Sequence, residues 1–133
     1  MKYALDTNII IHLILQNPNV VAGYIHAVEK NNEIVIPPYV DFEIRKGLEY
    51  KKAAAKMRAY LELCKSCKVS DMRKEIWIYA ADLYANLRRN GFTVADPDII
   101  IAAFCIVDGF TLVTNNTKDF SCIYNLTLED WLI

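Results

Sequence analysis

The sequence predicts an α/β fold in which a central parallel sheet is flanked by helices. Short apolar runs typical of buried strands alternate with longer segments whose apolar residues recur at helical spacing. Strands that are separated by helices are joined by crossover connections, and such connections make a parallel sheet. The 133 residues, of which 54% are hydrophobic and 23% charged, suit one compact domain over residues 1–133 rather than a disordered chain.

The first third of the chain predicts two strands and two helices. Residues 2–5 are a buried strand, and a helix is expected over residues 9–16. Pro18 begins a second helix, because proline favours the first helical turn. The apolar positions of that helix at helical spacing are Val21, Ile25 and Val28. Residues 34–36 form the second strand, which a Pro-Pro pair ends.

The middle of the chain predicts three helices and a short strand. The first helix is expected to face inward with Tyr39, Phe42, Ile44 and Leu48. A second helix covers residues 53–67, and Val69 marks a short strand. Ser70 or Asp71 caps a third helix over residues 72–89, which Asn90-Gly91 ends. The apolar stripe of this third helix is Ile76, Tyr79, Ala80, Leu83 and Leu87.

The last third predicts a buried helix and two strands. Pro97 and Asp98 begin the most apolar helix of the chain, over residues 99–107, and Gly109 ends it. Residues 111–113 form a strand, and residues 126–128 are expected to form another.

Four acidic residues stand out by their positions: Asp6, Glu43, Asp98 and Asp119. Asp6 follows the first strand, and Asp119 ends the block T-N-N-T-K-D-F, which follows the strand over 111–113. Ligands bind in the crevice outside the carboxyl ends of parallel strands. Carboxylates gathered there repel one another unless a cation joins them, and Mg²⁺ or Mn²⁺ acting on a phosphate substrate is the usual reason.

Each of these residues also has a simpler structural explanation. Asp6 and Asp98 each stand at the start of a helix, where aspartate is a favourable N-cap, although Thr7, Asn8 and Asp96 compete for the same roles. Glu43 could be a solvated charge that pairs with a nearby lysine. The block T-N-N-T-K-D-F could be only a polar loop, but it supplies the oxygen-bearing side chains Thr114, Asn116 and Asp119.

Charge and cysteine content narrow the function classes. The net charge of −1 neither requires nor excludes nucleic acid, although basic residues gather at Arg45, Lys46, Lys51, Lys52, Lys56 and Arg58. The longest apolar run, residues 99–107, is too short to span a membrane, and no signal peptide is expected. Cys64, Cys67, Cys105 and Cys122 lack the spacing of a zinc site, which favours free thiols in a cytoplasmic protein.

Several motifs are missing. The sequence contains no G-x-S-x-G, Walker A or G-x-G-x-x-G motif, so serine-hydrolase, P-loop and dinucleotide-binding functions have no support. His12 and His26 are isolated, and the chain therefore shows no histidine acid–base pair for a metal-free attack by a ribose 2′-OH.

Five blocks, taken in order, resemble the PIN-domain ribonucleases and, within them, the VapC toxins of toxin–antitoxin pairs. They are Y-A-L-D-T-N-I-I-I, F-E-I-R-K-G-L, P-D-I-I-I-A-A-F, L-V-T-N-N-T-K-D-F and the closing L-x-L-E-D-W. The resemblance spans essentially the whole chain. It implies a PIN-like three-layer fold, a metal-dependent endoribonuclease that uses Mg²⁺ or Mn²⁺, a VapB-like antitoxin partner and a homodimer. The T-N-N-T block and the E-D-W ending are similar to the branch that cleaves tRNA.

The resemblance also assigns site residues. Asp6, Glu43 and Asp98 match the three most regular acidic positions of the family, and Asp6 and Asp98 are the expected metal ligands. Asn8 and Thr114 match polar residues that support the acidic centre. The fourth catalytic position departs from the family, because Asn116 stands where many members have aspartate and Asp119 follows three residues later.

Two other functions remain open from the sequence. A non-catalytic PIN-fold module that binds RNA or protein is suggested by Asn116, although it would have no need for clustered carboxylates. A small-molecule phosphohydrolase could use the same acidic crevice, but it lacks a second aspartate two residues after Asp6, where Asn8 stands.

Overall fold

The computed structural model describes residues 1–133 and contains five strands and seven helices. The strands are β1 (Lys2–Leu5), β2 (Glu33–Ile36), β3 (Lys68–Val69), β4 (Thr111–Val113) and β5 (Leu128–Glu129). The helices are α1 (Thr7–Ile14), α2 (Pro18–Glu29), α3 (Pro38–Tyr50), α4 (Ala54–Ser66), α5 (Lys74–Arg89), α6 (Asp96–Asp108) and α7 (Thr117–Phe120). Every predicted strand is present, and the last lies slightly later in the chain than expected.

The sheet has the strand order β3-β2-β1-β4-β5, and every neighbouring pair is parallel. β1 lies at its centre, with Tyr3 opposite Ile34 of β2 and Leu5 opposite Val113 of β4. The carboxyl ends of β1 and β4 therefore lie next to each other, and the residues that follow them enter one crevice. The predicted α/β class with a parallel sheet is confirmed.

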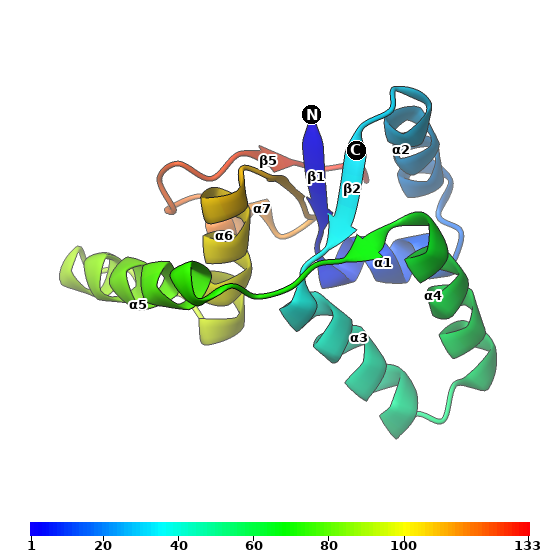
Figure 1. The fold of residues 1–133 in the computed structure, drawn as a ribbon, viewed down its shortest axis with the longest axis horizontal. Helices are drawn as coiled ribbons and strands as arrows, with labels where there is room; N and C mark the ends of the chain where they lie inside the picture. Colours follow the sequence, from blue (N-terminus) through cyan, green and yellow to red (C-terminus); the bar gives the residue numbers. More distant parts are fainter.

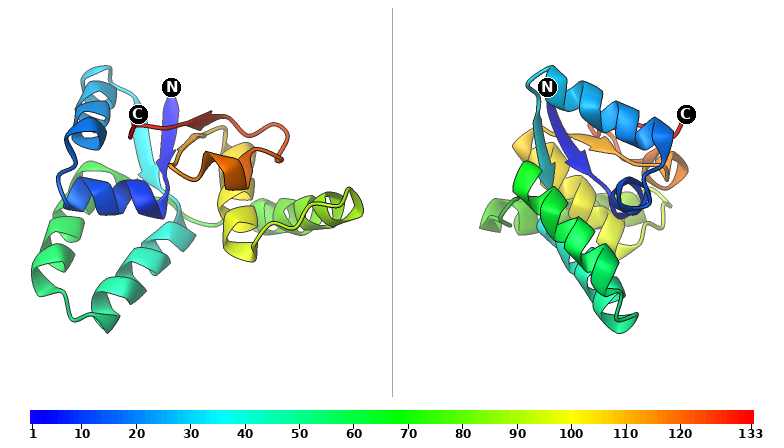
Figure 2. Two further views of the ribbon diagram at one scale, coloured as in Figure 1. Left: turned by 180° about the vertical axis from the view of Figure 1, so that it is seen from behind. Right: turned by 90° about the vertical axis from the view of Figure 1, so that its right-hand side faces the viewer.

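Helices flank the sheet and extend beyond it (Figure 1). α1 contacts α2, α3 and α4, whereas α5 packs along α6 and projects away from the sheet. Figure 2 shows the same arrangement from behind and from the side, with the α3–α4 hairpin pointing away from the strands. The carboxyl end of β1 thus lies between two groups of helices, α1–α4 and α5–α7, which contact each other through α3 and α6. None of the helices combines the length and the apolar character that crossing a membrane requires.

One hydrophobic core of 31 buried residues joins the sheet to the helices. α6 contributes the largest share of any helix, because it contacts α5, α3, α7 and β4. Phe104 of α6 is fully buried and stacks on Phe110 at a ring distance of 5.4 Å. This position explains why the helix reads as a continuous apolar run. Gly109 ends α6 in the left-handed conformation, as predicted.

The apolar spacing noted on α2 does not mark its buried face, since Ile25 and Val28 are exposed and the helix buries Val20 and Ala27. Two details of the sequence prediction are wrong. Phe42 does not face inward on α3 but is 53% exposed, where its ring contacts Tyr39 and the ammonium of Lys46. Neither Ser70 nor Asp71 caps α5, which begins after Arg73 without a side-chain cap.

Candidate active site

Asp6 is a buried carboxylate at the carboxyl end of the central strand. Its Oδ1 accepts a hydrogen bond from the backbone N–H of Thr7 at 2.8 Å, which makes Asp6 the N-cap of α1. Its Oδ2 accepts a bond from the hydroxyl of Thr114 at 2.7 Å and a longer one from Asn8 Nδ2 at 3.4 Å. The capping explanation is therefore correct, and both oxygens are fixed in place. Burial nevertheless raises the pKa of Asp6, and the negative charge of Glu43 adds to this effect.

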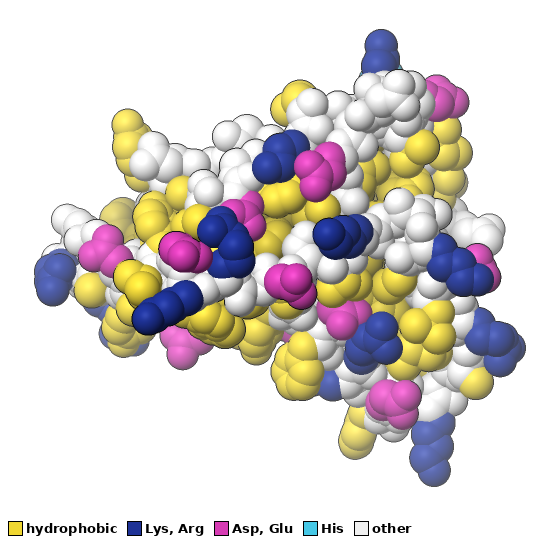
Figure 3. Space-filling model, in the orientation of Figure 1, with side chains coloured by type: hydrophobic (Ala, Val, Ile, Leu, Met, Phe, Trp, Pro, Cys, Tyr) yellow, Lys and Arg dark blue, Asp and Glu magenta, His cyan; other side chains and the backbone are white.

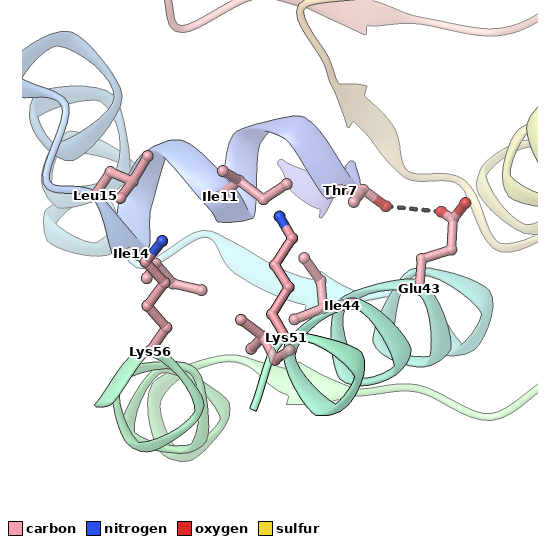
Figure 4. Close-up of a pocket in the computed structure, with 10 residues that line it drawn as sticks. Thr7, Ile11, Ile14, Leu15, Glu43, Ile44, Lys51 and Lys56 are labelled. Atoms are coloured by element: carbon pink, nitrogen blue, oxygen red, sulfur yellow. Dashed lines mark hydrogen bonds between the residues drawn. The ribbon is translucent and has the colours of Figure 1, made fainter. Parts of the chain in front are cut away.

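Glu43 reaches the same crevice from α3. The hydroxyl of Thr7 donates to Glu43 Oε1 at 2.7 Å, so this carboxylate is held against the first turn of α1 (Figure 4). The alternative expectation, a surface ion pair with Lys46 or Lys51, is wrong, because Glu43 forms no ion pair.

Asp98 lies in the first turn of α6 and is half-buried. Burial raises its pKa to about 6, with further contributions from the charges of Asp6, Asp119 and Glu43. The four predicted acidic residues are thus close enough to influence one another, although they come from four separate elements of the chain. Asp98 is not a side-chain N-cap, since α6 has no capping side chain at all.

The loop after β4 closes the crevice through Asn8 and Thr114. Asn8 Oδ1 accepts from the backbone N–H of Asn115 at 3.0 Å, and Thr114 Oγ1 accepts from the backbone N–H of Asn116 at 3.0 Å. These two bonds tie the loop to the residues that hold Asp6. The side chain of Asn116 is exposed and makes no capping bond to α7. The sequence did not indicate a role for Asn115, whose side-chain Nδ2 also donates to Asp130 Oδ2 at 3.3 Å.

The carboxylates fit a hard divalent cation in chemistry and in charge. Carboxylate oxygens are the ligands that Mg²⁺ and Mn²⁺ prefer. Burial is the main cause of the raised pKa of Asp98, and the charges of Asp6, Asp119 and Glu43 add a repulsion that a cation would relieve. No three Asp, Glu, His or Cys side chains meet at one metal-binding point.

A groove that sequence reasoning missed opens beside Glu43 between α1 and α3. Apolar side chains of α1 form one wall, and Lys51 and Lys56 extend across the groove from the α3–α4 side (Figure 4). Its lining residues are Thr7, Ile11, Ile14, Leu15, Glu43, Ile44, Gly47, Leu48, Lys51 and Lys56. Ile11 and Leu15 are exposed apolar side chains, so no other part of the chain covers this face of α1. The sequence alone does not reveal this exposure.

The predicted basic group lies on the α3–α4 hairpin. Dark blue side chains surround the hairpin in Figure 3, interspersed with acidic and apolar ones. Arg45, Lys46, Lys51, Lys52, Lys56 and Arg58 are all exposed. Arg45 is partly neutralised, because its Nε lies 2.9 Å from Asp41 Oδ1. All four cysteines are free, as expected, and Cys64 and Cys67 sit at the end of α4 without a metal cluster.

Comparison with known proteins agrees with this geometry. The model of the PIN-domain family matches residues 3–125. The chain belongs to the PIN-domain family. It is 33% identical to ribonuclease VapC2 of Rickettsia felis over 132 residues, which is 98% of both chains. Within the PIN-domain family it therefore belongs to the VapC ribonucleases.

Solved structures of VapC proteins share the fold. The VapBC2 complex of Rickettsia felis, bound to a promoter DNA fragment, matches with a TM-score of 0.87 at 31% identity, covering 98% of this chain and 99% of that one. The chain is also 29% identical over 136 residues to a protein of Salmonella typhimurium named tRNA(fMet)-specific endonuclease VapC, which covers 98% of both. The predicted PIN-like fold and VapC family are confirmed.

Proposed function

We propose that the chain is the toxin of a toxin–antitoxin pair and hydrolyses RNA phosphodiester bonds at the crevice formed by Asp6, Glu43 and Asp98. The observation that carries this proposal is that Asp6 and Glu43, far apart in sequence, both accept a hydrogen bond from Thr7 at the carboxyl end of β1, and that Asp98 lies near enough for their charges to raise its pKa. Membership of the VapC ribonucleases supports it. Asp6 has a structural role as the cap of α1, but burial and the neighbouring carboxylates raise the pKa of Asp98 and oppose folding, which favours a functional reason for its position.

The proposed site residues divide into those that bind the metal ion and those that hold other side chains in position. We assign Asp6 and Asp98 as the ligands of Mg²⁺ or Mn²⁺, with Asn116 and Asp119 at the rim of the same site. A bound divalent cation would neutralise phosphate charge and lower the pKa of a coordinated water. Thr7 fixes Glu43 Oε1, which leaves the second oxygen free to orient or deprotonate the attacking water. Asn8 and Thr114 hold Asp6 and the loop after β4 in place.

The test is cleavage of RNA by the purified protein, with and without Mg²⁺. Asp6→Asn and Asp98→Asn should each lower cleavage by about 10²-fold or more, because each removes a charge that acts in the transition state. Asp71→Asn is a matched control at an exposed position outside the crevice, and it should cleave normally. Equal activity of all variants, or full activity in excess EDTA, would refute the proposal. RNA binding without any product would favour the non-catalytic alternative instead.

We propose a structured RNA such as tRNA as the substrate. The support is similarity to the VapC protein of Salmonella typhimurium that is named for tRNA(fMet). The exposed cations of the α3–α4 hairpin lie beside the crevice and suit a phosphate backbone. Sequencing of the cleaved ends after incubation with total RNA tests this, and cleavage spread evenly over mRNA would overturn it.

We further propose that the groove beside Glu43 receives a segment of a VapB-like antitoxin. Structural relatives from Rickettsia felis and Haemophilus influenzae are VapBC complexes, which supports such a partner. The groove has the form that an amphipathic segment requires, since it is apolar along α1 and ends at a carboxylate and two lysines. An occupant would lie directly over Glu43 and exclude RNA.

Co-expression with the candidate antitoxin tests this assignment. Ile11→Asp should weaken antitoxin capture by about tenfold or more, because it places a charge on the apolar wall. Ile25→Asp, at an exposed position on α2 outside the groove, is the matched control and should retain binding. Unchanged capture by Ile11→Asp would place the antitoxin elsewhere.

Two further assignments complete the proposal. A homodimer is supported by the large apolar side chains that α5 exposes, among them Trp77 and Ile78, and light scattering of the purified toxin tests it. A cytoplasmic location is supported by four free cysteines and by an RNA substrate.

A further inference from the structure

A second pocket adjoins the acidic crevice on the side away from the groove beside Glu43. It is lined by Phe92, Thr93, Val94, Ala95, Asp98, Lys118, Asp119 and Cys122. Asp98 and Asp119 therefore belong both to the acidic cluster and to the wall of this pocket. A molecule held in the pocket would lie next to the bond that is cleaved.

The backbone at Phe92 is held by hydrogen bonds, yet the residue is partly exposed. The backbone N–H of Phe92 donates to Leu87 O at 2.9 Å, and that of Gly91 donates to Arg88 O at 3.1 Å. With Gly91 at φ +84°, these bonds form a Schellman motif, which fixes the chain as it leaves α5. In this motif the residue at the Phe92 position commonly packs on the last helical turn, but Phe92 remains 46% exposed. The backbone that carries Phe92 is thus fixed, and its ring lines the pocket wall as a partly exposed aromatic group.

Lys118 supplies a positive charge on the opposite segment. It lies in α7, is exposed and forms no ion pair with Asp98 or Asp119. Its ammonium is thus free for a phosphate at a site where every other charge that lines the pocket is negative. An aromatic face combined with a cation is the combination that recognises an unpaired nucleotide, through base stacking and backbone charge.

We propose that this pocket binds one unpaired nucleotide next to the scissile phosphate, with its base stacked on Phe92 and its phosphate contacted by Lys118. This inference rests on the proposed ribonuclease function and adds a specificity site to it. RNA would be cleaved only where a base can leave its helical stack, in a loop or at a bulge. A fully paired RNA would present no base to Phe92.

Steady-state cleavage of an RNA hairpin tests the proposal. Phe92→Leu keeps an apolar side chain but loses the ring, and it should lower kcat/KM by about 5- to 150-fold. Phe92→Trp should retain activity. Tyr50→Leu is a matched control, since Tyr50 is a 90% exposed aromatic residue at the end of α3. Circular dichroism and thermal unfolding check that each variant is folded.

An abasic substrate separates stacking from indirect effects. Removal of the base beside the cleavage site should slow the wild-type protein as much as Phe92→Leu does, and it should slow Phe92→Leu no further. Lys118→Met should reduce cleavage of normal and abasic RNA equally. Additive losses for Phe92→Leu and the abasic substrate would overturn the proposal, and so would an unchanged kcat/KM. A loss of antitoxin binding alone would do the same, because it would mark a protein-binding surface.

Binding without metal distinguishes this proposal from the ribonuclease function itself. The probe is a fluorescent single-stranded oligoribonucleotide in EDTA, followed by anisotropy. If the protein does not cleave RNA but Phe92→Leu still weakens oligonucleotide binding, the nucleotide pocket is supported and the ribonuclease function is refuted. If cleavage depends on Asp98 but not on Phe92, and Phe92→Leu binds the oligonucleotide as well as the wild type does, the ribonuclease function is supported and the nucleotide pocket is refuted.

Discussion

Replacement of Asp98 by asparagine should stabilise the metal-free protein while it removes activity. In the folded protein the pKa of Asp98 is raised from 3.8 to about 6, first by burial and then by three neighbouring carboxylates. This difference corresponds to about 3 kcal/mol of stability that the folded state lacks at neutral pH. Because Asp98 is only half-buried, solvent screening reduces the penalty to about 1.5 kcal/mol.

The pH dependence of the effect follows from the direction of the shift. Between about pH 4 and pH 6 the folded protein binds the proton of Asp98 more tightly than the unfolded chain does, so stability falls as the pH rises through this range. Asp98→Asn has no such proton. The variant should therefore exceed the wild type in stability at pH 7, and the difference should vanish below about pH 3, where Asp98 is protonated in both states.

Thermal unfolding in EDTA measures the effect. An asparagine at this position loses roughly 0.5 kcal/mol of favourable interaction with the N-terminus of α6, which leaves a net gain of about 1 kcal/mol and a Tm increase of about 3–5 °C. Asp96→Asn changes the same helical turn at an exposed position and should slightly lower the Tm. Equal or lower stability of Asp98→Asn at pH 7 would refute the idea that charge repulsion strains this site. Added Mg²⁺ should raise the Tm of the wild type more than that of the variant.

Four further predictions concern packing and the loop after β4. Gly23→Ala should destabilise the fold by about 1–3 kcal/mol in urea unfolding, because a Cβ there would lie 2.8 Å from Trp131 Cγ. Gly47 is a helical position where an added Cβ would meet no neighbouring atom within 4 Å. Gly47→Ala should therefore stabilise the fold by about 0.5–1 kcal/mol. Asn116→Asp should lower the Mg²⁺ concentration for half-maximal cleavage, and an unchanged titration would show that this position does not face the cation. Asn8→Ala should reduce kcat more than it raises KM, since it releases the loop amide held at 3.0 Å, whereas an effect on KM alone would contradict this role.

Much of the fold could be predicted because its signals are local. The strands are short apolar runs. Gly109 and the Asn90-Gly91 pair end their helices because the glycine in each adopts a positive φ. The buried face of α2 could not be predicted in the same way. The apolar residues of α2 occur on more than one side of the helix. The packing of α2 against Trp131 and the sheet, which the sequence does not show, buries Val20 rather than Ile25.

The site was partly predictable for a related reason. Asp6 and the loop after β4 follow strands, and topology alone brings strand ends together. Glu43 lies mid-helix, where its own sequence favoured a surface ion pair, and only the resemblance to the family selected it. The position of Phe92 had no usable signal, because an aromatic residue after a helix-ending glycine is ordinarily a packing contact. Its exposure depends on the path of the loop between α5 and α6.

Capping and ligand binding are compatible roles for Asp6, although the sequence presents them as alternatives. A carboxylate has about four lone-pair sites. The N–H of Thr7 and the hydroxyl of Thr114 occupy one site on each oxygen, and the amide of Asn8 lies near a third. Oδ1 therefore retains a free lone pair on a side chain that can no longer rotate. On the proposed assignment of Asp6 as a metal ligand, the helix cap immobilises that ligand in advance. A mobile carboxylate would lose side-chain entropy when it bound a cation, whereas Asp6 has already lost that entropy on folding.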